Sequence, residues 1–399
     1  MLRHPLRKLQ KRLNLLIEKS IGRGEPRPII KLLPQEDKNM AAITAAMVKE
    51  LREMTGAGMM DCKKALTETD GNMDAAVDVL KKSGAAKMEK KASRIAAEGI
   101  TRVAANDNTA VVVEVNSETD FVAKNAIFQE FVQIVADKAL TVDIDKAGDG
   151  EDVTEILGMK ELTAEKTLTI GEKLSIRRFE KVSGDCVASY IHGGGKIGVL
   201  VAATGATDVK EALTNVAMQI AAMSPQYISR NDISADELAK IKDIVLESSL
   251  NDPFTLPKPI LQKLIDRAIA EKVWDDETAA IYAEKKADKT FNMNYLPNFL
   301  SDAAKAGLAQ LALADKENIS TDKIFAGLVE GRISKQLKEI CLMDQVYVKA
   351  EDGKQTVAAY IASVNKNLVI SKMIRFEVGE GMQKKNEDFA AEVAKQMGQ

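Results

Sequence analysis

The chain is predicted to adopt an α+β fold, in which a three-helix unit precedes two related units of small sheet and helix. Two observations lead to this prediction. The middle of the chain repeats a strand–turn–helix pattern at a constant offset, and the segment before it carries short amphipathic helices with capping signals. A helical insertion interrupted by prolines is expected inside the second repeated unit, and a short helix at the end of the chain.

Composition restricts the class of protein. Of the 399 residues, 45% are apolar and 29% are charged, which is typical of a folded globular protein. The formal net charge of −3 argues against a nucleic-acid footprint along the whole chain, and no apolar run approaches the roughly 20 residues of a membrane span. Because Cys62, Cys186 and Cys341 are scattered, we expect reduced thiols, a cytoplasmic location, and neither a metal nor another cofactor.

Residues 1–39 differ from the rest of the chain. They hold ten Lys/Arg against four Asp/Glu, and leucines recur at helical spacing. A targeting or membrane-surface helix is one interpretation. We prefer a translated leader, because Gln35-Glu36-Asp37 can be encoded by a purine-rich ribosome-binding sequence just before Met40. A genuine but dispensable extension is the remaining alternative.

Three short helices are expected between residues 40 and 93. Thr44 caps the first, segment 55–58 breaks it because two glycines in four residues favour a tight loop, and Asn72 caps the third. The lysine-rich segment 81–94 is expected to be a solvated helix or a linker. It would lead out of the three-helix unit.

Met59 and Met60 are expected in a glycine-flanked loop of this unit. Methionine adapts to irregular apolar surfaces, so both are candidate contacts for a partner protein. The alternative, that both side chains fill the small core of the unit, stays open.

An internal repeat organises the middle of the chain. Each copy reads as strand, polar turn and helix, and a third strand is also duplicated, so two related subdomains are predicted. The aligned segments are 111–115 with 197–201, 133–136 with 219–222, and 176–180 with 374–378.

The turn after the first repeated strand carries Thr119, Asp120, Phe121 and Val122. An acid and an apolar wedge presented together at a loop tip suit intrusion into a site on another protein. The alternative is that Asp120 caps the next helix and Phe121 packs beneath it. The second copy has Thr207-Asp208 in place of Phe121-Val122, so the wedge is not needed to close the fold, which favours intrusion.

The glycine-rich segment 193–198 fits G-x-G-x-x-G letter by letter. That fingerprint binds a dinucleotide only when it follows a strand and opens a helix. These glycines precede a strand instead, so we predict a tight connection between two strands, with His192 in the loop. His4 and His192 are the chain's two histidines, and no catalytic residue is proposed.

A helical insertion is expected over residues 230–336, interrupted by several prolines. Its charged segment 263–289 predicts a solvated arm or an antiparallel hairpin. Trp274 is interpreted as a packing anchor, with an oligomer contact as the alternative. At the end of the chain, segment 388–394 reads as a short amphipathic helix suited to docking on a partner.

Four separated motifs resemble the bacterial translation elongation factor Ts family. They are LREMTGAGMMDCKKAL from Leu51, ETDFVAK from Glu118, HGGGKIGVLVA from His192 and IRFEVGEG from Ile374. The resemblance covers almost everything after Met40. The departures are residues 1–39 and an insertion that is longer than expected near 250–320.

The resemblance implies a protein without catalytic chemistry of its own, which promotes GDP release from elongation factor Tu. It implies that residues 119–122 disturb the magnesium site of that GTPase, and that a ubiquitin-associated-like three-helix unit and the C-terminal helix grip it. The partner-binding residues implied are Arg52, Thr55, Gly56, Ala57, Gly58, Met59, Met60, His192 and Phe389. The insertion matches the position of the family's dimerisation arm, so a homodimer stays open. Neither nucleic acid nor membrane is expected as a direct partner.

The chain is accordingly divided into six parts. These are a basic extension (1–39), the three-helix unit with its linker (40–93), a first core subdomain (94–184), a second core subdomain (185–229 with 337–378), the inserted helical arm (230–336) and a C-terminal docking module (379–399).

Two other classes of function remain open. A plain adaptor would use the three-helix unit to recognise an extended or ubiquitin-like surface, with no effect on nucleotide. An enzyme would use His192 and the glycine turn on a phosphorylated substrate, although the missing motif context counts against it. Stimulated GDP release separates the adaptor from an exchange factor.

Overall fold

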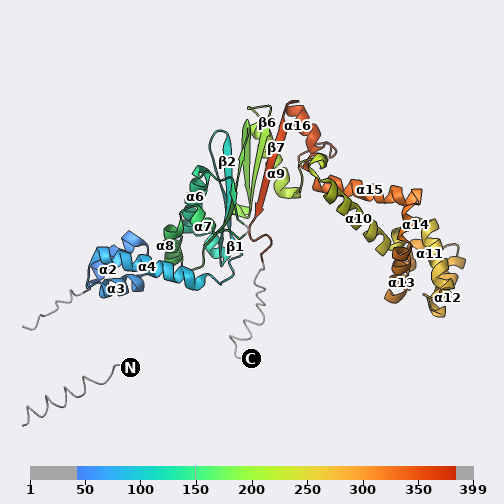
Figure 1. Ribbon diagram of the computed structural model, residues 1–399, viewed down its shortest axis with the longest axis horizontal. Coiled ribbons are helices and arrows are strands. Elements are labelled where there is room, and N and C mark those ends of the chain that lie inside the picture. Colours follow the sequence, from blue (N-terminus) through green and yellow to red (C-terminus); the bar gives the residue numbers. More distant parts are fainter. Residues whose placement is uncertain (1–42, 149, 383–399) are drawn as a thin grey trace, which may run out of the picture.

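The computed structural model describes residues 43–148 and 150–382. A helical unit lies at each end of the long axis, and two antiparallel sheets lie between them (Figure 1). The α+β prediction is confirmed. The leader expected at 1–39 and the C-terminal helix with Phe389 lie outside the described residues.

The first helical unit contains α2 (Ala45–Thr55), α3 (Met59–Glu68) and α4 (Met73–Lys91). As predicted, the side chains of Thr44 and Asn72 accept backbone N–H groups in the first turns of α2 and α4. Gly56 ends α2 with φ 66°, a conformation that glycine adopts without strain. The core of the unit includes Leu51 and Leu66, both fully buried.

The prediction of a solvated helix over residues 81–94 is confirmed as far as Lys91, since most of these side chains are exposed, but one face of the helix is covered. Helix α4 continues to Lys91 and packs on α8 (Lys160–Ile170). A Cβ atom at Gly84 would lie 3.0 Å from the Ala164 carbonyl oxygen, so the missing side chain lets the helices approach closely. Leu168 of α8 also belongs to the core of the three-helix unit. The unit is therefore packed against the layer that covers the first sheet.

Two sheets form the centre of the molecule. The first has the order β1-β2-β4-β3, with β1 (Glu98–Ala105), β2 (Thr109–Ser117), β3 (Lys146–Ala147) and β4 (Ser175–Ser183). The second has the order β5-β6-β7, with β5 (Cys186–His192), β6 (Ile197–Thr204) and β7 (Val369–Glu377). Their helices are α5 (Asp120–Ala123), α6 (Ala126–Thr141), α7 (Val153–Ile156), α9 (Lys210–Met223) and α16 (Val357–Val364).

The predicted duplication is present in the structure. Strands β2 and β6 hold equivalent places, each between two antiparallel neighbours, and α6 and α9 pack on their outer faces. Val111 and Val113 face α6, whereas Ala110 and Val112 face the second sheet across a shared core. Burial on both faces explains why these strands read as continuous apolar runs.

The predicted tight connection at 193–198 is confirmed as a single 3₁₀ turn, η1 (Gly193–Gly195), between β5 and β6. Gly195 has φ 104°, and a Cβ there would lie 2.8 Å from the Cβ of Ile100. The Thr101 hydroxyl donates to the Gly195 carbonyl oxygen at 2.9 Å. The glycines thus let the hairpin tip pack closely on β1.

The insertion consists mainly of α10 (Ala235–Asn251), α11 (Lys258–Ala270), α12 (Asp276–Ala287), α13 (Asp302–Ala314), α14 (Lys316–Ser320) and α15 (Lys323–Ile340). The solvated arm expected at 263–289 is wrong, because these helices share a core of their own. Trp274 is 3% exposed and its indole N–H donates to the Ala304 carbonyl oxygen at 2.9 Å, so its interpretation as a packing anchor is confirmed. Helix α15 also continues past the boundary expected at 336.

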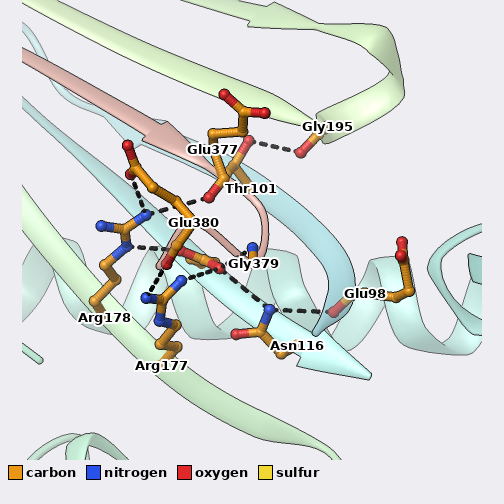
Figure 2. Close-up of polar contacts among 10 residues, drawn as sticks. Glu98, Thr101, Asn116, Arg177, Arg178, Gly195, Glu377, Gly379 and Glu380 are labelled. Carbon is orange, nitrogen blue, oxygen red and sulfur yellow. Dashed lines mark hydrogen bonds and ion pairs between the residues drawn. The ribbon is translucent and has the colours of Figure 1, made fainter. Parts of the chain in front are cut away.

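A buried carboxylate joins the two sheets. Glu114 of β2 is 0% exposed, and its oxygens accept from Arg177 Nη1 at 2.9 Å and Arg178 Nε at 2.6 Å. Asn116 Nδ2 at 3.1 Å and the Gly379 backbone N–H at 2.8 Å complete the set (Figure 2). Because Gly379 follows β7, this carboxylate ties the first sheet to the end of the last strand of the second.

Glu114→Gln is expected to lower the free energy of unfolding by about 3 kcal/mol, because two partly buried arginines lose their counter-charge. Chemical denaturation of the variant and the parent protein measures the difference. Glu53→Gln is the matched control, since Glu53 lies in an exposed pair with Lys49 at 3.7 Å and its loss should change the free energy by at most about 0.5 kcal/mol. Equal losses in the two variants would contradict a structural role of the buried carboxylate.

Candidate functional site: a braced loop that presents one aromatic side chain

The loop after β2 presents Phe121 to solvent. The side chain is 79% exposed, with the Lys124 ammonium 5.9 Å from the centre of its ring. Thr119, not Asp120, is the N-cap of the short helix α5, and Phe121 is not packed beneath it. The alternative in which Asp120 caps the helix and Phe121 packs beneath it is therefore wrong.

Asp120 stands beside the exposed ring as a charged group. Lys124 Nζ lies 2.9 Å from Asp120 Oδ2, and this hydrogen bond holds the pKa of the Asp120 carboxyl below its usual range. The Asp120 side chain is 47% exposed. The loop tip thus carries an accessible carboxylate next to an accessible phenyl ring.

Hydrogen bonds from outside the loop hold its base. Glu172 accepts from the Thr119 backbone N–H at 2.9 Å and from the Thr119 hydroxyl at 2.7 Å. Glu118 accepts from the Lys173 backbone N–H at 2.6 Å and from Arg94 Nη1 at 3.1 Å. Partial burial by itself would raise the pKa of the Glu118 carboxyl. The hydrogen bonds have the larger combined effect, so the pKa is lowered.

Packing from below completes the support. Val122 and Ala123 are 8% and 6% exposed and belong to the core under the first sheet. Val122 therefore anchors the loop, which corrects its expected place among the residues that reach a partner. Asn125 then caps α6 by accepting the Ile127 backbone N–H at 2.8 Å.

Two other segments share this end of the sheets. Glu98 pairs with Ser117 in the β1–β2 ladder, and Lys196 of the hairpin tip forms an ion pair with Glu98. A Cβ at Gly379 would lie 2.4 Å from the Ala97 carbonyl oxygen, so the chain leaving β7 passes the start of β1. The loop, the tip and the exit of the chain thus gather at one edge.

His192 lies at the start of the hairpin tip and is exposed. Its Nδ1 lies 3.2 Å from the Tyr190 hydroxyl, which comes from the same strand. The turn that follows packs on Ile100 and Thr101 of β1, so the glycines cradle protein rather than phosphate. No group of three or more His, Cys, Asp or Glu side chains within residues 43–148 and 150–382 is placed to hold a metal ion.

The methionines of the three-helix unit form a second candidate surface. Met59 and Met60 are the first residues of α3 rather than loop residues, and they are 58% and 64% exposed. The alternative that they fill the core is therefore wrong. Met54, near the end of α2, is 61% exposed and was missed by the sequence reasoning. Its position off the apolar stripe of Val48 and Leu51 is the signal that could have found it.

The remaining predicted residues of this unit have different environments. Arg52, Gly56 and Gly58 are exposed, and Thr55 is half-buried with its hydroxyl donating to the Leu51 carbonyl oxygen at 2.7 Å. Ala57 is 1% exposed, so it supports the turn and cannot contact a partner directly.

An exposed phenyl ring on a braced loop, with exposed methionines on a neighbouring unit, is typical of proteins that bind another protein. The profile of the family described as elongation factor TS matches residues 118–282 and 289–380. Over 374 residues the chain is 41% identical to elongation factor Ts of Clostridioides difficile (strain 630), and the alignment covers 90% of this chain and 100% of that relative. The chain belongs to the elongation factor Ts family and has that family's role in protein biosynthesis.

The family match extends across most of the segment near 250–320, where the insertion was expected to be longer than in the family. Apart from residues 283–288, it lies within the matched ranges. None of the helices in the described part of the chain is both long and apolar enough to cross a membrane.

Phe121→Ala is expected to change the free energy of unfolding by at most about 0.5 kcal/mol, because the ring is exposed. Val122→Ala, the adjacent control, should cost about 1.5 kcal/mol, because two methyl groups leave a buried site. Denaturant titration of both variants checks this difference. A larger loss for Phe121→Ala than for Val122→Ala would contradict the description of the loop.

Proposed function

We propose that this protein is a guanine nucleotide exchange factor, which binds the GDP form of elongation factor Tu and promotes GDP release by disturbing its magnesium site. One observation carries the proposal: Phe121 is 79% exposed beside a charged Asp120, on a loop braced from both sides. Membership of the elongation factor Ts family supports the choice of partner.

The chemistry of magnesium explains how such a loop can act. Mg²⁺ demands near-ideal octahedral geometry, and in nucleotide sites it joins phosphate oxygens to protein ligands. A phenyl ring that displaces the side chains supporting the metal weakens nucleotide binding without any covalent bond being made or broken. Asp120 adds negative charge near the site where the positive charge of the metal ion neutralises the nucleotide phosphates. By thermodynamic linkage, bound nucleotide must then weaken the binding of the exchange factor to the GTPase to the same extent.

A separate surface supplies affinity in this proposal. The exposed Met54, Met59 and Met60 lie on both sides of the turn between α2 and α3, and methionine suits contact with irregular apolar surfaces. Contacts from the C-terminal segment, which lies outside the described residues, are part of the same proposal. A homodimer through the insertion stays a proposal, with neither nucleic acid nor membrane as partner.

Phe121→Ala is expected to slow stimulated GDP release at saturating factor by about tenfold or more, equivalent to 1.4 kcal/mol of lost coupling. Stopped-flow release of a fluorescent GDP analogue from purified elongation factor Tu measures the rate. Tyr295→Ala is the matched control, since Tyr295 is an aromatic side chain of the insertion that is 58% exposed. Parental release by Phe121→Ala, or an equal loss in the control, would remove the basis of the proposal.

Met59→Ala with Met60→Ala should weaken association with the GTPase by about tenfold, because apolar contact area is lost. The maximal release rate should stay near that of the parent, since the loop is unchanged. Titration of the release rate against factor concentration separates the two quantities. Met223→Ala, at a methionine of α9 that is 48% exposed, is the control. An unchanged half-saturation point would require another role for the methionine surface.

The two other classes make different predictions. An adaptor would bind elongation factor Tu with no change in GDP release by the parent protein. An enzyme acting through His192 would lose its activity in His192→Ala, whereas exchange through the loop should keep most of its maximal rate.

A further inference from the structure

The segment Gly171-Glu172-Lys173, between α8 and β4, contacts both the loop and the end of the three-helix unit. We infer that Glu172 and Lys173 are positioning residues for exchange, which hold α5 in a fixed relation to α4. The inference rests on the proposed function, because it assigns a role within that reaction. Neither side chain needs to touch the partner for this role.

Glu172 holds the loop. Its two carboxylate oxygens accept from the backbone N–H and the hydroxyl of Thr119, at 2.9 Å and 2.7 Å. Thr119 is the N-cap of α5, and its own side chain makes no capping bond to that helix. The direction in which Phe121 points therefore depends on a carboxylate from another element, 53 residues away in the sequence.

Lys173 holds the end of the three-helix unit. Its ammonium donates to the carbonyl oxygens of Ala92 and Arg94, at 2.6 Å and 2.8 Å. Ala92 is the C-cap of α4, where a cation is favoured by the unpaired carbonyl groups of the helix end. Partial burial lowers the pKa of Lys173, while the nearby Glu118 opposes that shift. The backbone N–H of Lys173 also donates to Glu118 at 2.6 Å, at the base of the loop.

Two further contacts connect this segment, the loop and α4. Lys91 of α4 donates to the Gly171 carbonyl oxygen, and Arg94 donates to both oxygens of Glu118 at 3.1 Å and 3.2 Å. The same short segment thus contacts α4 through Lys91 and Lys173, and contacts the loop through Glu172 and the Lys173 N–H. These contacts connect two parts of the molecule. One is the methionine surface, which is proposed to bind the GTPase, and the other is the phenyl ring, which is proposed to disturb its magnesium site.

Holding the loop in a fixed position relative to the three-helix unit has a kinetic consequence. When the GTPase is held by one surface, a misplacement of about 1 Å in the acting group can cost roughly a hundredfold in rate, although affinity is hardly changed. Loss of a positioning residue should therefore lower the maximal release rate more than it raises the half-saturating concentration. A residue needed only for folding would instead lower the amount of active protein.

The test measures both quantities for Glu172→Ala, with Glu165→Ala as control on the neighbouring helix, where the side chain is 48% exposed. We expect the maximal release rate of Glu172→Ala to fall about tenfold, with the half-saturating concentration within about twofold of the parent. Glu172→Gln keeps one acceptor oxygen and should recover part of the rate. Lys173→Met keeps its backbone N–H to Glu118, so it should lower the rate less and raise the half-saturating concentration.

The outcomes are separable from failure of the proposed function. If Phe121→Ala slows release and folded Glu172→Ala releases GDP at the parental maximal rate, the positioning role is overturned and the proposed function stands. If both variants match the parent, the proposed function itself fails. Should Glu172→Ala not fold, Glu172→Gln decides, because a folded Gln variant at the parental rate overturns the inference and an intermediate rate supports it.

Discussion

The arrangement of the sheets depends on a charge that is buried completely. Glu114 can lie between the sheets because two arginines, an asparagine amide and a backbone N–H satisfy its oxygens. These partners come from β2, from β4 and from the chain just beyond β7. One carboxylate thereby fixes the first copy of the repeat against the last strand of the second. The loop that carries Phe121 begins only a few residues further along β2.

A fixed strand end alone would not orient a four-residue helix. Buried Val122 holds α5 from below, and Glu172 holds its N-cap from the side. The N-cap backbone N–H is hydrogen-bonded and Val122 is packed in the core. The exposed groups at the tip, Asp120 and Phe121, are therefore the ones available to a partner. Preorganisation of this kind reduces the free energy lost when a contact forms. The loop is thus held to the core by packing under α5 and by hydrogen bonds at its N-cap.

The sequence was most informative where a pattern is local. Capping at Thr44 and Asn72, the break at Gly56 and the repeated strands follow from neighbouring residues and were predicted. The docking of α4 on α8 was not, because it depends on Gly84 meeting a helix about eighty residues further on. The Glu114 network and the Glu172 brace were missed for the same reason. A lone glutamate within an apolar strand, followed by paired arginines in a later strand, was the available signal.

The most direct test of the account is the dependence of the Phe121 effect on magnesium. GDP release stimulated by the parent protein and by Phe121→Ala is compared at saturating Mg²⁺ and again with the metal removed by a chelator. If the ring acts by disturbing the metal site, the ratio of the two rates falls from about tenfold or more to near unity when Mg²⁺ is absent. A ratio that is unchanged without the metal would contradict the account, because the ring would then act elsewhere on the GTPase.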